Sequence, residues 1–449
     1  MKIIIAGAGE VGYHLAKLLS YESQDITLID CNKENLAYAD AHLDIRVIKG
    51  DGTSINVLRE ARVGTADLVI TVTSSETTNI TICVLAKQLG CRRTIARISN
   101  TEFIDNQKEL KFTDLGIDEL ISPEKLAAAE IKLLLDQSAF NDSYEFEDGA
   151  LTMVGTTLQR TAPFVGKSVK EAASIFPELH FVPIAIQRFG TQYTLIPRGD
   201  TLFKEGDQVY FITSKEGVEE LYKLIGKIKE DIKNVMILGG SNIGFKTARD
   251  LCKNKFNVKL IEKDKDKAFD LADDLPDALV IQGDGRNVEL LEEEGVYDMD
   301  AFIAVTGNSE TNIMSCLVAK SKNIRKTIAL VENMDYFQLS QSIGIDTLIN
   351  KKLLAANNIF RHIRKGDVVD MTRLNNMNAE LLEFVVKPTS RVCNKRIKDL
   401  DFPRSAIIGG VIREGEGMIA LGDFRIKSGD RVVVCSLPRS INKVERMFL

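Results

Sequence analysis

The chain of 449 residues repeats its own sequence at a separation of 232 positions, measured from Gly7 to Gly239. KIIIAGAGEVG at 2–12 returns as NVMILGGSNIG at 234–244, VIKGDGT at 47–53 as VIQGDGR at 280–286, and TIARISN at 94–100 as TIALVEN at 327–333. The pair GDTLFKEGDQVYFI at 199–212 and GDFRIKSGDRVVVC at 422–435 extends the match. Matching segments in the same order predict two copies of one structural unit.

Each copy begins with short apolar segments that alternate with helical patterns. In the first copy the apolar segments are IIIAG, ITLID, IRVIKG, LVITVT and TIARI. Strands rich in Ile, Val and Leu that alternate with helices are typical of a parallel sheet covered on both faces. We therefore predict the α/β class, with two Rossmann-like doubly wound lobes at 1–140 and 232–370. Turn signals between apolar runs predict a small α+β lobe after each, at 141–226 and 371–449.

The composition excludes several classes of function. A net charge of −6, with 27% charged residues, argues against nucleic acid as a partner. The seven cysteines form no CxxC pair, so we expect neither a disulfide scaffold nor a metal site. No apolar run approaches the roughly 20 residues that cross a bilayer. Any work at a membrane is therefore expected to need a partner.

The first glycine-rich turn has the context of a dinucleotide-binding motif. Gly7, Gly9 and Gly12 link a predicted strand to a helix, and Asp30 ends the second predicted strand. In this motif the first glycine permits a tight turn, the second lets backbone approach a pyrophosphate, and the third lets the helix close on the sheet. The free N–H groups of the helix start bind phosphate. Asp30 would accept the hydroxyls of an unphosphorylated adenosine ribose. The alternative is a purely structural turn.

Further polar residues follow the other predicted strands of the first lobe. Open α/β sheets bind ligands at the carboxyl ends of their strands, around the switch point in strand order. Each of these residues also fits an ordinary turn or helix cap, so their shared location carries the prediction. They are Gly50, Asp51 and Gly52 after the third strand, Thr73 and Ser74 after the fourth, and Arg97 at the end of the fifth.

The second copy departs from the first at four positions. Ser241 replaces the middle glycine, Glu262 replaces Asp30, Arg286 replaces Thr53, and Leu330 replaces Arg97. A serine side chain narrows the approach to a pyrophosphate, while Glu262 still offers a carboxylate to a ribose. The second pocket is expected to hold a different nucleotide or to hold it differently. A vestigial, empty pocket is the alternative.

The sequence contains no evident catalytic centre. A dehydrogenase needs a group that exchanges a proton with the substrate, and the four histidines, His14, His42, His180 and His362, show no such setting. HExxH, GxSxG and P-loop motifs do not occur. We therefore expect a sensor that is not an enzyme. The alternative is an NAD-dependent oxidoreductase with the small lobes as substrate caps, and an S-adenosylmethionine-dependent methyltransferase is a weaker one.

The order of the motifs resembles the RCK (KTN) domain family. GAGEVG, Asp30, GDGT, VTSSETTN and ARI, duplicated and each followed by a small lobe, carry this resemblance over essentially the whole chain. The tandem arrangement is similar to the cytosolic NAD-binding subunits of Trk potassium uptake systems. The resemblance implies a regulatory subunit that binds NAD(H) and ATP or ADP. It also implies a homo-oligomeric ring, a tetramer, that lies at the inner face of the cell membrane against an integral potassium-translocating subunit.

The resemblance also implies which residues contact the nucleotides. In the first pocket they are Gly7, Gly9, Glu10, Val11, Gly12, Asp30, Asp51, Thr73 and Arg97. In the second they are Gly239, Ser241, Asn242, Ile243, Gly244, Glu262, Asp284 and Thr306. Ser241 departs from the pattern of the first copy, and so does Leu330, which has no side chain able to bind a phosphate.

Overall fold

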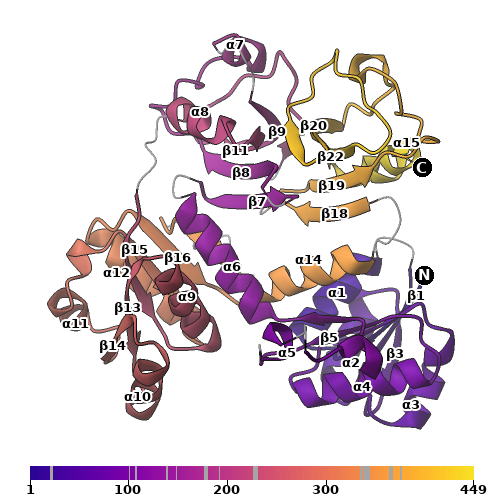
Figure 1. Ribbon diagram of the computed structural model, residues 1–449, viewed down its shortest axis with the longest axis vertical. Coiled ribbons are helices and arrows are strands. Elements are labelled where there is room, and N and C mark those ends of the chain that lie inside the picture. The colour runs from indigo at the N-terminus through magenta and orange to yellow at the C-terminus, as the bar shows by residue number, and fades with distance from the viewer. Residues whose placement is uncertain are drawn as a thin grey trace.

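The structure is a computed structural model. It describes residues 1–20, 24–100, 102–106, 109–137, 140–147, 149–175, 180–191, 193–225, 231–333, 336, 344–363, 368–374 and 377–448, with the backbone alone for 105, 224, 360–363 and 368–373. The expected lobe junctions near 226–232 and 370 fall partly outside the described residues. The two predicted Rossmann-like lobes and the two small lobes are present, which confirms the predicted fold class (Figure 1).

The first Rossmann-like lobe is built on a six-stranded parallel sheet. Its strand order, β3-β2-β1-β4-β5-β6, is that of the doubly wound Rossmann fold, with the switch point between β1 and β4. Ile3, Ile4 and Ile5 are all buried because helices cover both faces of the sheet. The strands are β1 (Lys2–Ala6), β2 (Asp25–Asp30), β3 (Arg46–Lys49), β4 (Leu68–Thr71), β5 (Thr94–Arg97) and β6 (Glu119–Ile121).

The helices of this lobe begin at side-chain caps that the sequence supplies locally. Ser75 accepts a hydrogen bond from Thr78 N–H at the start of α4, and Ser122 caps α6 with a proline in its first turn. Both caps satisfy an N–H group at the start of their helices. The helices are α1 (Glu10–Ser20), α2 (Lys33–His42), α3 (Ile55–Glu60), α4 (Glu76–Gln88), α5 (Glu102–Asp105) and α6 (Pro123–Asp136).

The second Rossmann-like lobe repeats this plan with the equivalent order β14-β13-β12-β15-β16-β17. Its strands are β12 (Asn234–Leu238), β13 (Asn257–Glu262), β14 (Ala278–Gln282), β15 (Ala301–Ala304), β16 (Lys326–Leu330) and β17 (Thr347–Ile349). Its helices are α9 (Asn242–Lys253), α10 (Lys265–Asp274), α11 (Val288–Glu293), α12 (Ser309–Ser321) and α14 (Lys351–Ile363).

The last helix of each Rossmann-like lobe crosses over and packs on the other lobe. Helix α6 contacts α9, helix α14 contacts α1, and the two crossing helices contact each other (Figure 1). Ile359 of α14 is buried in the same apolar core as Leu15 of α1, and Ile131 of α6 shares a core with Leu251 of α9. The two lobes are therefore joined by exchanged helices, and residues of one lobe reach the edge of the other.

The small lobes each contain a five-stranded antiparallel sheet and pack on one another. Ile184 and Ile212 of the first lie in one core with Ile412 and Val433 of the second. The first lobe has β7 (Asp142–Phe146), β8 (Leu151–Thr157), α7 (Val169–Ala173), β9 (Phe181–Gln187), β10 (Thr194–Leu195), β11 (Gln208–Ser214) and α8 (Gly217–Leu224). The second has β18 (Val368–Arg373), β19 (Glu380–Val385), β20 (Ala406–Arg413), β21 (Glu416–Met418), β22 (Arg431–Ser436) and α15 (Ile441–Phe448).

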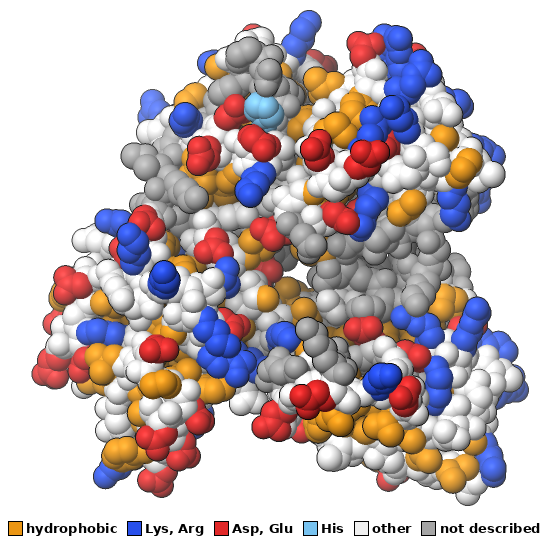
Figure 2. All heavy atoms as spheres, viewed as in Figure 1, with side chains coloured by type: hydrophobic (Ala, Val, Ile, Leu, Met, Phe, Trp, Pro, Cys, Tyr) orange, Lys and Arg blue, Asp and Glu red, His pale blue; other side chains and the backbone are white. Residues whose placement is uncertain are grey.

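Three general properties bear on function. Acidic and basic side chains are interspersed over the face of the molecule that Figure 2 shows. The seven cysteines are free thiols. In the described part of the chain, no helix combines the length and apolarity that a bilayer crossing requires.

Candidate functional site

A cavity of about 660 Å³ opens at the carboxyl edge of the first parallel sheet. The segments that follow β1, β2, β3 and β4 converge on it together with the last residue of β5, beside the switch point in strand order. Small-molecule sites commonly have volumes of about 300 to 1,000 Å³, so the cavity has the size of a nucleotide site. Its lining residues are Ala6, Gly7, Gly9, Glu10, Val11, Ile29, Asp30, Cys31, Asn35, Gly50, Asp51, Gly52, Val72, Thr73, Ser74, Ser75, Thr78, Ile82, Arg97 and Lys352.

The structure brings the predicted residues of the first copy together at this cavity, with one exception. Gly12 is not among the lining residues. It lies behind the turn, where an added Cβ would come 1.8 Å from the carbonyl oxygen of Gly7. This contact is the close approach of helix to strand that the motif requires. Gly12 therefore shapes the turn and does not face the cavity.

The other two glycines leave the turn open. Gly7 has a φ of 110°, a conformation that strongly favours glycine. A Cβ on Gly9 would meet no atom within 4 Å, so the space in front of this residue is empty. Because Gly9 precedes α1 and has no side chain, no cap from this position covers the first N–H groups of the helix. The turn thus presents free donors to the cavity.

Asp30 lies at the end of β2 and is bound to the glycine turn. Its carboxylate accepts hydrogen bonds from the N–H groups of Ala8 and Asn32, the second at 2.7 Å. In the second copy Glu262 accepts the same two bonds, from Gly240 N–H at 2.9 Å and Asp264 N–H at 3.0 Å. Each acidic residue therefore holds its turn in place as well as facing the site.

Asp51 shapes the loop after β3. It accepts hydrogen bonds from the N–H and the hydroxyl of Thr53, both at 2.8 Å. These bonds, the backbone one first, lower the pKa of Asp51 below its ordinary value, so the carboxylate is ionised at neutral pH. The turn role considered for Asp51 is therefore present, and the same carboxylate lines the cavity.

Sequence reasoning missed Asn79, which positions two predicted residues. Its Oδ1 accepts hydrogen bonds from the N–H and the hydroxyl of Thr73, and its Nδ2 donates to Arg97 O at 2.9 Å. Asn312 makes the equivalent bonds to Thr306 and Leu330 O. The asparagine in the repeated phrases VTSSETTN and VTGNSETN was the available signal, because it occupies the same place in both copies.

Sequence reasoning also missed Lys352, which lines the first cavity from the other lobe. It lies in the first turn of α14, and its Nζ forms ion pairs with Glu10 and Glu332, the latter at 2.9 Å. Burial by itself lowers the pKa of Lys352, but its hydrogen bonds to these carboxylates outweigh that effect and raise the pKa. No local signal could have placed Lys352 here, because its position depends on the exchange of helices.

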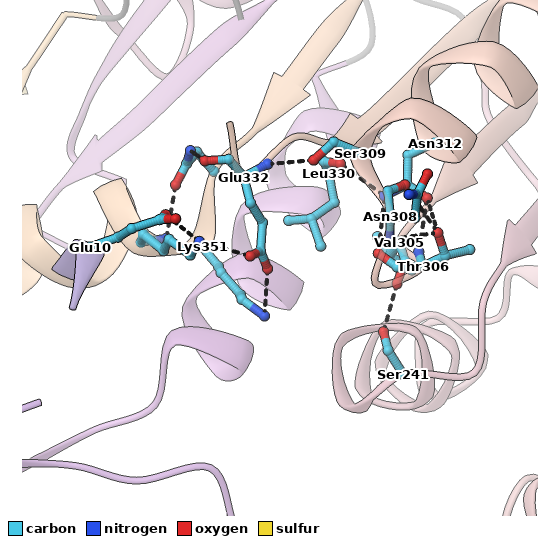
Figure 3. A network of polar contacts seen from close by, with 12 residues as sticks. Glu10, Ser241, Val305, Thr306, Asn308, Ser309, Asn312, Leu330, Glu332 and Lys351 are labelled. Carbon is cyan, nitrogen blue, oxygen red and sulfur yellow. Dashed lines mark hydrogen bonds and ion pairs between the residues drawn. The ribbon is translucent and has the colours of Figure 1, made fainter. Parts of the chain in front are cut away.

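The second glycine turn has the same backbone shape as the first, but the side chain of Ser241 forms hydrogen bonds with the backbone around it. Gly239 has a φ of 102°, and a Cβ on Gly244 would lie 1.9 Å from Gly239 O. Ser241 Oγ caps α9 by accepting from Gly244 N–H at 3.3 Å, and it donates to Val305 O at 2.7 Å (Figure 3). One N–H of the helix start is thus already satisfied. The predicted residues Asn242 and Ile243 form the first turn of α9.

The two carboxylates predicted for the second site, Asp284 and Glu262, both form ion pairs with lysine or arginine. Arg286 Nη2 lies 2.6 Å from Asp284 Oδ2, and Lys263 Nζ lies 3.2 Å from the same oxygen. Hydrogen bonding to Arg286 is the main cause that holds the pKa of Asp284 far below its ordinary value. Lys267 pairs with Glu262 at 3.1 Å. A ligand that uses either carboxylate must compete with these cations.

Two expectations about other chemistry concern residues away from these pockets. His362 was expected to have no proton-exchanging role, and its side chain lies outside the described residues. None of the residues that line the first cavity is a histidine. Within the described ranges, no group of three or more His, Cys, Asp or Glu side chains has a metal-binding arrangement.

The fold and the first site define a class: a duplicated Rossmann-fold protein with a glycine turn open to a nucleotide-sized cavity and an α+β lobe attached to each copy. Family models agree with this division. The TrkA-N domain matches residues 3–123 and 235–351, and the TrkA-C domain matches 153–226 and 381–449. The chain belongs to the TrkA family of Trk system potassium uptake proteins.

Individual relatives support this assignment along the full chain. The Trk system potassium uptake protein TrkA of Halomonas elongata is 33% identical, and the match covers 100% of this chain and 98% of the relative. TrkA homolog 1 of Methanosarcina mazei is 32% identical, with 100% of both chains covered. Among solved structures, the GsuK channel bound to NAD has a TM-score of 0.61 at 16% identity, covering 100% of this chain and 78% of the other. At that identity the likeness concerns the fold.

Proposed function

We propose that this chain is the nucleotide-sensing regulatory subunit of a Trk-type potassium uptake system. It binds NAD(H), ATP or ADP in the first cavity, and the bound nucleotide changes the relative positions of the lobes. The observation that carries the proposal is the open turn at Gly9, with free helix N–H groups in front of it and Asp30 beside it. Solved structures of the GsuK channel with NAD and with ADP support this choice of ligands.

The predicted contacts follow from the positions of the residues in the cavity. A pyrophosphate or phosphate chain binds the backbone between Gly7 and Val11 at the positive end of α1. Asp30 accepts the ribose hydroxyls, and its charge disfavours a ribose that carries a phosphate. Arg97, at the far side of the switch point, offers its planar guanidinium to phosphate oxygens.

The second pocket binds an adenine nucleotide more weakly or in another pose. A ligand there competes with Lys267 for Glu262 and with Arg286 for Asp284. Gly239, Gly244 and Thr306 retain the backbone arrangement of the first copy. The unequal pockets allow two nucleotides to stabilise different arrangements of one chain.

Regulation follows from differential binding and requires no chemical step. A nucleotide that prefers one arrangement of the lobes shifts the equilibrium toward it, and equal affinity for both arrangements shifts nothing. Coupling free energies of about 1 to 3 kcal/mol are typical of such systems. In a homo-oligomeric ring, such as a tetramer, each subunit contributes its own coupling free energy. The ring lies at the cytoplasmic face of the membrane and acts on an integral potassium-translocating subunit.

Replacement of Gly9 tests the binding site with little risk to the fold. Because a Cβ at Gly9 enters empty space, Gly9→Ala leaves the protein folded but places a methyl group where the phosphates bind. Calorimetry of the full chain with NAD⁺, NADH, ATP and ADP is expected to show affinity reduced by about 10-fold or more. Ser241→Ala, the matched change in the second copy, should leave this binding event intact. Failure of the wild-type chain to bind any of these ligands would refute the proposal.

The partner is tested with membranes. The chain should copurify with an integral Trk-type potassium transporter and change its potassium flux when the bound nucleotide is exchanged. Steady turnover of NADH with carbonyl compounds, without such copurification, would favour the oxidoreductase alternative.

A further inference from the structure

A chain of polar contacts leads from the first cavity into the second Rossmann-like lobe. Glu10, in the first turn of α1, pairs with Lys352 of α14, and Lys352 pairs with Glu332 just after β16. The N–H of Glu332 donates to Ser309 Oγ at 3.0 Å, at the start of α12 (Figure 3). The N–H of Asn308, the cap of α12, donates to the hydroxyl of Thr306, one of the residues predicted for the second site.

Lys352 is held firmly at its backbone, and it lines the cavity with its ammonium group paired to Glu10, another lining residue. Asn350 Oδ1 accepts the Lys352 N–H at 3.0 Å, and Asn350 Nδ2 donates to Glu332 O at 3.1 Å. The helix behind it is fixed by burial of Ala355, Ala356 and Ile359. The side chain of Lys352 is 23% exposed, whereas that of Glu10 is 68% exposed. Glu10 is therefore the partner that can most readily move away.

The charges of this junction differ from those of its counterpart in the repeat. In the sequence repeat, Glu10, Lys352 and Glu332 correspond to Asn242, Glu124 and Ser99. Glu124 lies in the first turn of α6, which crosses to α9 as α14 crosses to α1. A junction needed only to hold the lobes together would not require opposite charges at the two equivalent positions. Of the two equivalent helix positions, that in α14 carries a lysine and that in α6 a glutamate, and the lysine lines the first cavity.

A phosphate at the glycine turn competes directly with Glu10 for Lys352. The phosphate chain binds within one turn of Glu10, so its negative charge repels that carboxylate and attracts the ammonium group. A terminal phosphate carries a second negative charge near neutral pH, which the two bridged phosphates of a dinucleotide lack. A nucleoside di- or triphosphate therefore gains more from Lys352 than NAD does.

We propose that Lys352 is a specificity-determining residue that the second lobe supplies to the first pocket, where it favours nucleotides with a free terminal phosphate over dinucleotides. When Lys352 exchanges Glu10 for that phosphate, its contact with Glu332 transmits the occupancy of the first pocket to the start of α12. This inference rests on the proposed nucleotide binding, and it adds a discrimination that the glycine turn alone does not make.

The test compares ATP with NAD⁺ on the full-length chain by calorimetry without divalent cations, following the binding event that Gly9→Ala weakens. Lys352→Gln is expected to weaken ATP binding by about 10-fold or more, and NAD⁺ binding by less than about 3-fold. Lys352→Arg should retain the preference for ATP, which separates loss of charge from loss of folding. Lys351→Gln is the matched control, because Lys351 also pairs with Glu332 at 2.7 Å but does not line the cavity.

Hydrogen exchange tests the transmission step. ATP should change the exchange of amides 306–312 in the wild-type chain, and Gly9→Ala and Glu332→Gln should each abolish this change. Equal effects of Lys352→Gln on ATP and NAD⁺, or no effect on either, would overturn the specificity role while leaving the proposed function standing. Unchanged exchange in the wild-type chain with ATP bound would overturn the transmission. Wild-type protein that binds neither nucleotide would overturn both proposals.

Discussion

Ser241 Oγ lies 2.7 Å from Val305 O, so the side chain that replaces the middle glycine of the second turn is bonded to the end of the neighbouring strand. The same oxygen caps α9 through Gly244 N–H. The substitution that distinguishes the two turns thus exchanges an open phosphate-binding position for local stability. The N–H groups at the start of α1 stay free for a ligand, whereas an N–H group at the start of α9 is bonded to Ser241.

Ser241→Ala should destabilise the start of α9 by about 1 kcal/mol, because both hydrogen bonds of the hydroxyl are lost. Hydrogen exchange of the first turn of α9, together with urea denaturation, measures this change. Asn242→Ala is the control, since Asn242 is an exposed neighbour outside the cap. Equal exchange rates in the two variants would contradict the capping role.

Gly12→Ala and Gly9→Ala should differ sharply in stability although both remove a glycine from one motif. A methyl group at Gly12 would meet Gly7 O at 1.8 Å, whereas one at Gly9 meets nothing within 4 Å. We expect Gly12→Ala to destabilise the first lobe by about 3 kcal/mol or more and Gly9→Ala by about 1 kcal/mol or less. Thermal and urea unfolding would show this order, and similar losses would contradict the packing role assigned to Gly12.

Ile359→Ala should weaken the attachment of α14 to the first lobe. Ile359 is fully buried in the core that contains Leu15, and removal of such a side chain typically costs about 2 to 5 kcal/mol. Ile55→Ala is the control, because Ile55 is 45% exposed. Limited proteolysis should cleave the first variant between the lobes sooner than the wild type. Equal cleavage rates would mean that α14 does not join the lobes in solution.

The ion pairs of Glu332 predict a defined dependence of stability on pH. Burial raises the pKa of Glu332, but hydrogen bonds from Lys351 and Lys352 outweigh it and lower the pKa. A carboxylate with a lowered pKa stabilises the fold above its unfolded pKa, about 4.3, and loses that contribution as pH falls through the folded value. Because the pKa of Lys352 is raised, the contribution of Lys352 to the free energy of unfolding is retained until the pH exceeds about 10.4.

The difference in unfolding free energy between wild type and Glu332→Gln should therefore be constant from about pH 6 to 8 and shrink below about pH 4. Urea denaturation at several pH values measures it. A difference that grew on acidification would show that the ion pairs do not stabilise the junction.

Much of the fold was predictable because its signals are local. Alternating apolar strands and helices, with glycine turns between them, predicted two doubly wound sheets, and both sheets are of this kind. The cavity residues at the strand ends, such as Gly7, Asp30 and Arg97, were also predictable, because the carboxyl ends of parallel strands meet at one edge. Asn79 was missed although its signal was present in both copies, since a buried positioning residue resembles any polar residue near a helix start.

The sequence by itself determined the duplication, the two sheets and the difference between the two glycine turns, because a repeat, an alternation of apolar segments and a serine in place of a glycine are all visible in the order of the residues. Tertiary structure alone decided that Lys352 lines the first cavity and that Glu332 pairs with it. Those contacts arise from exchanged helices, and the apolar pattern of a helix does not by itself name the lobe on which it packs. Packing of the whole molecule selects the lobe that each crossing helix contacts. The reason is that burial of a helix depends on the shape of the surface opposite it as well as on its own apolar residues.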